Sequence, residues 1–136
     1  QECADVLAKL DGKYSLHNNY QELFLADNHK HVGKGKEIIW AVQQDGVNTQ
    51  SYGVTNYLIF ASTGGETMTA SDLGISSGWG GIRTTQQFYD LFKEGDKRDL
   101  FWKEGHQKDV EDILKWTHGY GFQKFKNIKR RPAFSP

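Results

Sequence analysis

The sequence has little cysteine, which could crosslink the fold, and little proline, which would interrupt helices and strands. Its 136 residues include one cysteine and two prolines. The single Cys3 excludes an internal disulfide and a cysteine-ligated metal cluster. Its place at the start of a helical pattern favours a small packed side chain over a nucleophile. No apolar run reaches the length that a membrane-spanning helix requires.

The chain also lacks an excess of either charge. Seventeen basic residues balance seventeen acidic ones, which disfavours a uniformly basic nucleic-acid-binding surface. Hydrophobic residues are scarce at 37%, whereas aromatic residues are frequent at 13%. Large rings must therefore supply much of the buried surface, and some remain available for a ligand face.

Apolar periodicity and turn residues predict a fold that is mainly α with short β-strands, an α+β arrangement. Capping boxes at Asn19–Glu22 and Thr84–Gln87 mark two helix starts. The last predicted strand is expected to pair with the first. Helices are expected over about 2–11, 19–27, 84–94 and 109–117, and strands over about 37–42, 56–61 and 119–126.

The segment from Asp45 to Gly81 has little periodicity. It contains eight glycines and many Ser, Thr and Asn residues. Such a long irregular stretch in a compact domain is either functional or disordered. The apolar run at 56–60 disfavours disorder, so we expect an ordered loop shaped by its glycines.

Motifs for catalysis or cofactor binding are weak. His29 and His31 have the spacing of a metal pair, but a third ligand is missing, so solvated loop histidines and no metal are expected. The Gly33–Lys36 run lacks the spacing of a phosphate-binding loop. No serine lies in a nucleophile-elbow context, and no carboxylate pair stands out for glycoside hydrolysis. The sequence therefore predicts a protein that is not an enzyme and uses no cofactor.

The residue types that remain are those that bind sugars. Aromatic rings stack on the flat C–H faces of sugars, while amide and guanidinium groups bond their hydroxyls. The candidate glycan-binding residues are Tyr52, Asn56, Tyr57, Trp79 and Arg83. On composition alone a structural role is favoured over ligand contact: Trp79 between glycines could fill a core, and Arg83 could bond a carbonyl or an acid.

Seven short motifs, in this order, resemble the central region of the SusD/RagB-like family. Taken together they extend over nearly the whole chain. They are residues 12–16, 20–29, 37–42, 52–59, 78–85, 96–98 and 119–121.

The resemblance implies a function and a location. Members of this family are surface lipoproteins of the outer membrane in Bacteroidetes, built mainly from tetratricopeptide-like helix pairs with an irregular insert. They capture oligosaccharides for a TonB-dependent SusC-like transporter, without cleavage and without a cofactor. The chain is then expected to be one segment, residues 1–136, of a longer protein whose lipid anchor lies elsewhere. Peptide-capturing relatives leave the ligand class open. A second interpretation also remains open: the chain is a docking segment that contacts the transporter or further helices and makes no ligand contacts of its own.

Overall fold

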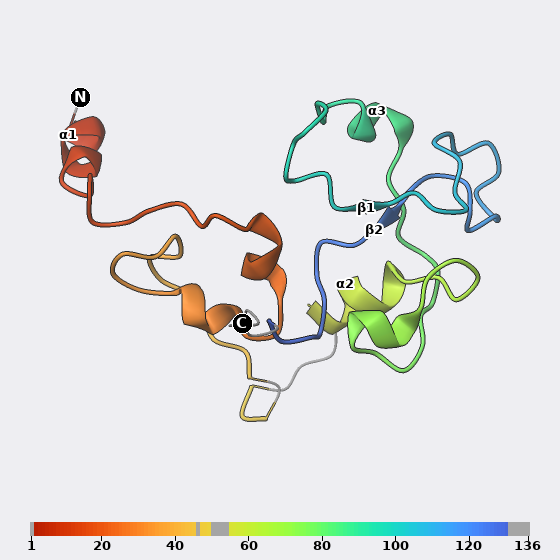
Figure 1. The fold of residues 1–136 in the computed structure, drawn as a ribbon, viewed down its shortest axis with the longest axis horizontal. Coiled ribbons are helices and arrows are strands. Elements are labelled where there is room, and N and C mark those ends of the chain that lie inside the picture. Colours follow the sequence, from red (N-terminus) through yellow and green to blue (C-terminus); the bar gives the residue numbers. More distant parts are fainter. Residues whose placement is uncertain (1, 46, 50–54, 131–136) are drawn as a thin grey trace, which may run out of the picture.

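The computed structural model describes residues 2–45, 47–49 and 55–130. The expected combination of helices with short strands is present, although most of the described chain is irregular (Figure 1). In chain order the elements are α1 (Glu2–Ala8), η1 (Tyr20–Phe24), η2 (Asn28–His31), α2 (Thr55–Ala61), η3 (Ala70–Leu73), α3 (Gln86–Tyr89), β1 (Phe101–Trp102) and β2 (Gly121–Phe122).

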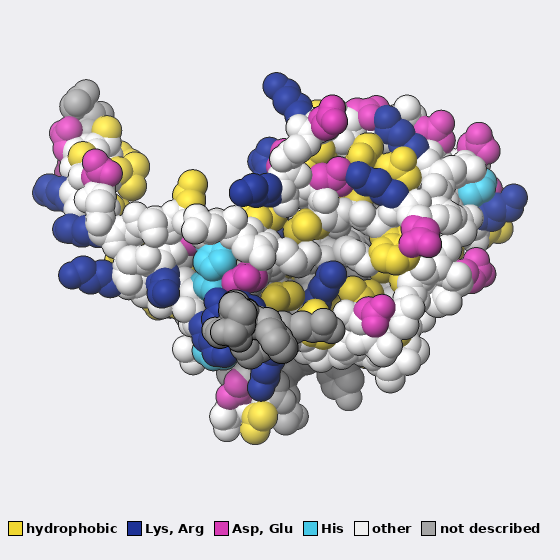
Figure 2. All heavy atoms as spheres, in the orientation of Figure 1, with side chains coloured by type: hydrophobic (Ala, Val, Ile, Leu, Met, Phe, Trp, Pro, Cys, Tyr) yellow, Lys and Arg dark blue, Asp and Glu magenta, His cyan; other side chains and the backbone are white. Residues whose placement is uncertain are grey.

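Helix α1 forms where the sequence predicts a helix, but it ends at Ala8 instead of residue 11. None of its residues is buried, and its apolar side chains Val6 and Leu7 are exposed. In Figure 1 the helix stands apart from the rest of the chain, and Figure 2 shows hydrophobic side chains on its surface. Among the described residues, no helix combines the length and apolar character needed to cross a bilayer.

The helix predicted over 19–27 is replaced by one short 3₁₀ turn, η1, and a second 3₁₀ turn, η2, begins just after this range. The capping box is absent at this start. The Asn19 side-chain amide instead donates to Glu22 Oε1 at 3.2 Å, and neither η1 nor η2 has a side-chain cap bond. Without a cap, the segment forms a tight turn in place of an α-helix.

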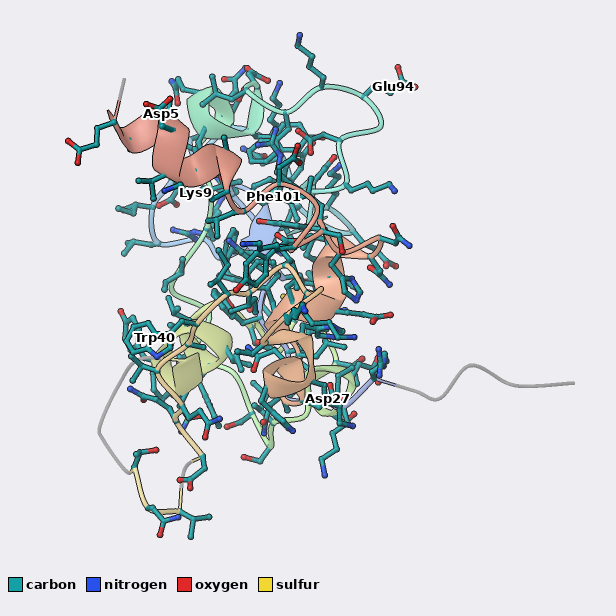
Figure 3. All side chains as sticks on the ribbon, turned by 90° about the vertical axis from the view of Figure 1, so that its left-hand side faces the viewer. Asp5, Lys9, Asp27, Trp40, Glu94 and Phe101 are labelled. Carbon is teal, nitrogen blue, oxygen red and sulfur yellow. The ribbon has the colours of Figure 1, made fainter. Side chains whose placement is uncertain are left out.

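The strand predicted over 37–42 is wrong. Only Ile38 forms a bridge, with Val32, and the next apolar residues have no neighbouring strand. Trp40 is 78% exposed and points away from the body in Figure 3. The apolar, β-branched composition therefore reflects an exposed surface instead of a buried strand.

The strand predicted over 56–61 is also wrong, because these residues form helix α2. Ile59 and Ala61 are buried, Ile59 in the hydrophobic core. The Ser62 and Thr63 hydroxyls donate to the carbonyls of Leu58 and Ile59, at 2.5 and 2.7 Å. These bonds accompany the end of the helix, and burial of one face overrides the local strand preference.

Helix α3 is shorter than the helix predicted over 84–94, and its N-cap lies one residue later than expected. Thr85, not Thr84, is the N-cap, and its hydroxyl accepts the Phe88 N–H at 3.4 Å. Thr84 is buried, and its backbone N–H donates to the carbonyl of Tyr120. Because that bond fixes Thr84 outside the helix, the cap moves to the next threonine.

The helix predicted over 109–117 does not form. The Asp112 carboxylate accepts the Leu114 N–H at 2.9 Å, and the Asp112 N–H donates to Nδ1 of His118 at 3.0 Å. Side chains thus occupy backbone groups that a helix would have paired internally. The apolar residues that the predicted helix would have buried are exposed, Leu114 by 90%.

The strand predicted over 119–126 is confirmed only in its centre, as β2, and its predicted partner is wrong. It pairs antiparallel with β1 (Phe101↔Phe122 and Trp102↔Gly121), not with residues 37–42. Beyond β2 the chain turns toward η1. There Lys126 N–H donates to the Phe24 carbonyl at 3.2 Å, and Ala26 N–H donates to the Ile128 carbonyl at 2.9 Å.

The hydrophobic core lies between α2, η3 and the C-terminal segment. Ile59, Met68, Leu73 and Trp116 form its centre, and Ile75, Trp102 and Phe125 pack against them. Thr63 is fully buried beside this core. The core thus supports α2 and the loop that follows it.

Candidate functional site

Three aromatic side chains gather on the surface, and we call them the ring cluster: Tyr57, Phe60 and Trp79. The Trp79 ring centroid lies 6.0 Å from that of Tyr57 and 5.3 Å from that of Phe60, with tilted planes. Tyr57 is 50% exposed and Trp79 is 61% exposed. The cluster therefore presents ring surface to water.

Helix α2 brings two of these rings together. Residues three apart lie on the same side of a helix, whereas on a strand they point to opposite faces. Tyr57 and Phe60 therefore share a face only because the segment is helical. On the strand predicted over 56–61, Phe60 would face away from Tyr57, so the strand prediction gives no reason to include Phe60 in the site.

Trp79 is held in place through the main chain. Its backbone N–H donates to the carbonyl of Phe60 at 2.8 Å, and the Gly80 N–H donates to that of Thr63 at 2.9 Å. Gly78 packs so closely on the Thr63 carbonyl that a Cβ there would overlap it, and Gly80 has a φ of 62°. These glycines allow the loop to lie directly on the end of α2.

A shallow hollow of about 180 Å³ lies beside Trp79. Its size is below that of pockets that enclose whole small molecules, so it has room for a single ring of an extended ligand. Glycine backbone, one carboxylate and two indoles line it: Gly64, Gly65, Glu66, Gly78, Trp79, Gly80 and Trp116.

Arg83 has a structural environment. Its guanidinium donates to the carbonyls of Ile113 and Lys115, the first at 2.7 Å. The same group lies 5.8 Å from the ring centroid of Trp116. It thus satisfies the loop carbonyls left unpaired where no helix forms, one of the roles the sequence left open.

The remaining predicted residues do not join the ring cluster. Asn56 lines a different and larger hollow of about 800 Å³, between α2 and the segments 24–32, 38–45 and 125–127. Tyr52 lies outside the described residues. The structure therefore brings together Tyr57 and Trp79, adds Phe60, and separates Asn56 and Arg83 from them.

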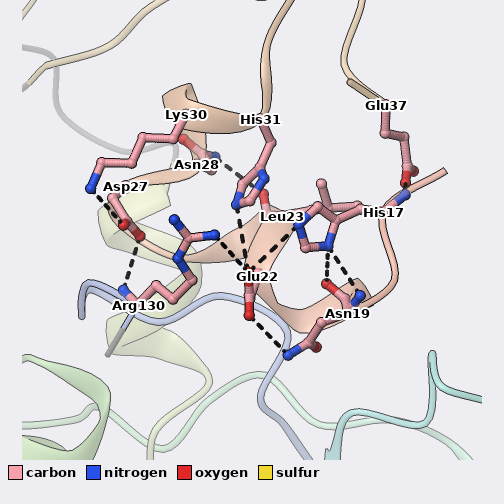
Figure 4. Close-up of polar contacts among 10 residues, drawn as sticks. All are labelled: His17, Asn19, Glu22, Leu23, Asp27, Asn28, Lys30, His31, Glu37 and Arg130. Atoms are coloured by element: carbon pink, nitrogen blue, oxygen red, sulfur yellow. Dashed lines mark hydrogen bonds and ion pairs between the residues drawn. The ribbon is translucent and has the colours of Figure 1, made fainter. Parts of the chain in front are cut away.

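A polar cluster lies among η1, η2 and the C-terminal segment (Figure 4). Glu22 Oε2 lies 3.6 Å from His17 Nε2, 3.9 Å from His31 Nε2 and 3.2 Å from Arg130 Nη1. The two imidazole rings are 4.2 Å apart and nearly perpendicular. His29, the partner that the sequence suggested for His31, is exposed.

Buried charge accompanies this cluster. The Arg130 N–H donates to Asp27 Oδ1 at 3.0 Å, and Lys30 Nζ lies 3.2 Å from Oδ2. The bond from the Arg130 backbone, followed by that from Lys30, lowers the pKa of Asp27 below its usual value. Burial lowers the pKa of His31. No sequence motif connects these residues, because their spacings of 5, 9 and 103 positions follow no local pattern.

The chain is similar to one protein of known name over part of its length. Across 66 residues, 48% of this chain, it is 39% identical to the starch-binding protein SusD of Bacteroides thetaiotaomicron. The matched stretch covers 11% of that protein, far less than two thirds of its length. No protein-family model matches the chain, and no solved structure matches it significantly. The similarity supports a SusD-like relationship.

Proposed function

We propose that the chain is part of a non-catalytic glycan-binding protein, with the ring cluster as its contact surface for oligosaccharides. The exposed pairing of Tyr57 with Trp79 carries this proposal. Two tilted rings open to water offer stacking surface for apolar sugar faces. The partial similarity to a protein named for starch binding supports the same ligand class.

The neighbouring hollow adds polar partners for sugar hydroxyls. Glu66 and the main chain of several glycines line it beside Trp79. Carboxylate and carbonyl oxygens accept hydrogen bonds from hydroxyl groups, and backbone N–H groups donate to them. One sugar ring stacked on Trp79 would therefore meet both apolar and polar groups.

The cellular setting follows from the resemblance to SusD-like proteins. We expect the intact protein to be a surface lipoprotein of the outer membrane that passes oligosaccharides to a TonB-dependent SusC-like transporter. No nucleic acid is expected as a partner, and the membrane is contacted through a lipid anchor outside this segment. The tetratricopeptide-like architecture of the intact protein belongs to the same proposal.

Replacing Trp79 with alanine tests the ligand assignment. Loss of one stacking ring is worth about 1 to 1.5 kcal/mol, roughly a tenfold weaker affinity. The melting temperature should change by only a few degrees, because the side chain is 61% exposed. Calorimetric titration of the intact protein with soluble oligosaccharides, starch-derived ones included, measures the affinity.

Trp40→Ala is a matched control. Trp40 is the more exposed tryptophan, at 78%, and has no place in the ring cluster. Its loss should leave oligosaccharide affinity unchanged. Equal weakening by both variants, or unaltered affinity with a large fall in melting temperature for Trp79→Ala, would contradict the proposal. So would an intact protein that binds no oligosaccharide.

A docking function is the second candidate, and exposed apolar residues favour it. Ile39, Trp40 and Val42 are each more than half exposed and adjacent along the chain. Monomeric surfaces rarely leave large apolar groups together without a partner. If this segment contacts the transporter or further helices, Trp40→Ala should weaken co-purification with the transporter and spare oligosaccharide binding.

A further inference from the structure

Three side chains of metal-ligating type converge near η1 and η2. One ligand atom from each of His17, Glu22 and His31 lies within 4.8 Å of the others. His31 is buried, and His17 and Glu22 are largely covered. They come from three consecutive segments: the extended chain before η1, then η1, then η2 (Figure 4).

The distances from Glu22 to the two histidines are close to those of a tetrahedral zinc site. Zinc bonds of about 2.1 Å place neighbouring ligand atoms roughly 3.4 Å apart. The Glu22 oxygen lies 3.6 Å from one histidine nitrogen and 3.9 Å from the other. Two imidazole nitrogens and one carboxylate oxygen form a donor set that suits a divalent first-row metal. We propose that His17, Glu22 and His31 bind a single Zn²⁺ ion.

Neighbouring groups orient these ligands. Nδ1 of His17 lies 2.9 Å from the carbonyl oxygen of Asn19, and the Asn19 side-chain amide donates to Glu22 Oε1 at 3.2 Å. In protein zinc sites the second imidazole nitrogen usually donates to a carbonyl or carboxylate, which fixes the ring. The backbone N–H of Asn19 lies 3.1 Å from the same Nδ1 and donates to it in the other tautomer. When Nδ1 carries the proton, it donates to the Asn19 carbonyl and leaves Nε2 to bind the metal. The Glu22 oxygen that Asn19 does not bond remains for the metal.

Arg130 is the natural competitor of the ion. Its Nη1 lies 3.2 Å from the same Glu22 oxygen. A cation at that oxygen displaces the guanidinium, whose side chain is partly exposed and free to turn to solvent. The Arg130 main chain stays in place, because its N–H donates to Asp27. The segment therefore remains attached while the ion and the guanidinium exchange.

The site would join three segments of the N-terminal region at one point. Three protein ligands leave a fourth position for water or an outside donor. The three ligands, His17, Glu22 and His31, are not members of the ring cluster. Zinc binding and glycan binding can therefore be tested independently of each other.

Zinc titration of the intact protein tests the site. After treatment with a chelator, Zn²⁺ is titrated in competition with a chromophoric chelator, and Co²⁺ absorption reports nitrogen and oxygen ligation. His17→Gln and Glu22→Gln should weaken Zn²⁺ binding at least tenfold and remove one bound equivalent. His29→Gln is the matched control, because His29 is an exposed histidine on the same turn as His31; it should bind as the wild type does.

Arg130→Gln gives a readout that misfolding cannot imitate. Removal of the competing guanidinium should tighten Zn²⁺ binding several-fold, while the main-chain bond to Asp27 is kept. If His17→Gln and Glu22→Gln fail to fold, this variant carries the test alone. Wild-type protein without a bound zinc equivalent, equal loss in His29→Gln, or unchanged or weaker binding in Arg130→Gln would each overturn the proposal.

Discussion

The region around η1 and η2 and the region around α2 and Trp116 are stabilised by different interactions. In the first, charged and polar side chains bridge segments distant in sequence, as Asp27 and Arg130 do. In the second, apolar side chains and closely packed glycines make the contacts, as at Trp116 and Gly78. The stability of the first region should therefore respond to charge and pH, and that of the second to side-chain volume.

The largest expected effect comes from added volume in the second region. Gly78→Ala places a Cβ against the Thr63 carbonyl and should cost about 3 to 5 kcal/mol of unfolding free energy, the range of severe core defects. Gly65→Ala is the control, because a Cβ there meets nothing within 4 Å. Chemical denaturation measures both. Similar small losses in the two variants would break the distinction between the regions.

Charge removal in the first region should have the next largest effect. Asp27→Asn weakens charge-assisted bonds to the Arg130 N–H and to Lys30, at a cost of about 2 kcal/mol. The lowered pKa means that the ionised carboxylate stabilises the fold above its ordinary value of 3.8. That contribution is lost as the pH falls through the lower folded-state value.

The stability of the wild type should therefore decrease more steeply below about pH 4 than that of Asp27→Asn. Denaturation curves from pH 6 to pH 3 measure this difference. Parallel pH profiles would show that Asp27 does not hold the two segments together through its charge.

Arg83→Ala joins the two kinds of interaction and should have an intermediate effect. It removes bonds to two loop carbonyls and a contact with the Trp116 ring, for a loss of about 1 to 2 kcal/mol. Oligosaccharide affinity should stay within twofold of the wild type, since the guanidinium is engaged with the loop at 113–115. A tenfold loss of affinity at unchanged stability would place Arg83 in the ligand site instead.

The smallest effect is expected at Leu114, which is 90% exposed. Leu114→Ser should change the unfolding free energy by less than about 0.5 kcal/mol, as surface substitutions do. Thermal melts of the intact protein measure it. A loss above 1 kcal/mol would mean that this apolar loop is covered by another part of the intact protein, in line with a docking role.

The mixture of helix and strand could be predicted, and so could the helix near residue 2 and the short strand at Gly121, because these elements have local signals. The cap of α3 is fixed by the distant Tyr120 and could be placed only to within one residue. The helical form of segment 56–61 could not be predicted, because it depends on the burial of Ile59 against residues distant in sequence such as Trp116.

The candidate site divides in the same way. Aromatic composition singled out Tyr57 and Trp79, whereas the contribution of Phe60 required the helix of α2. Arg83 was ambiguous from its residue type, and only the loop at 113–115 decides its contacts. The convergence of His17, Glu22 and His31 depends on two tight turns that no residue pattern specifies.

The bond from Arg130 to Asp27 closes a loop of 103 positions. Closing so long a loop costs entropy that only later contacts repay. During synthesis the segment around η1 leaves the ribosome long before Arg130 does. Lys126 and Ile128, which form backbone hydrogen bonds with the η1 segment, are translated just as late. Its final conformation must therefore wait for a stretch of chain translated about a hundred residues afterwards.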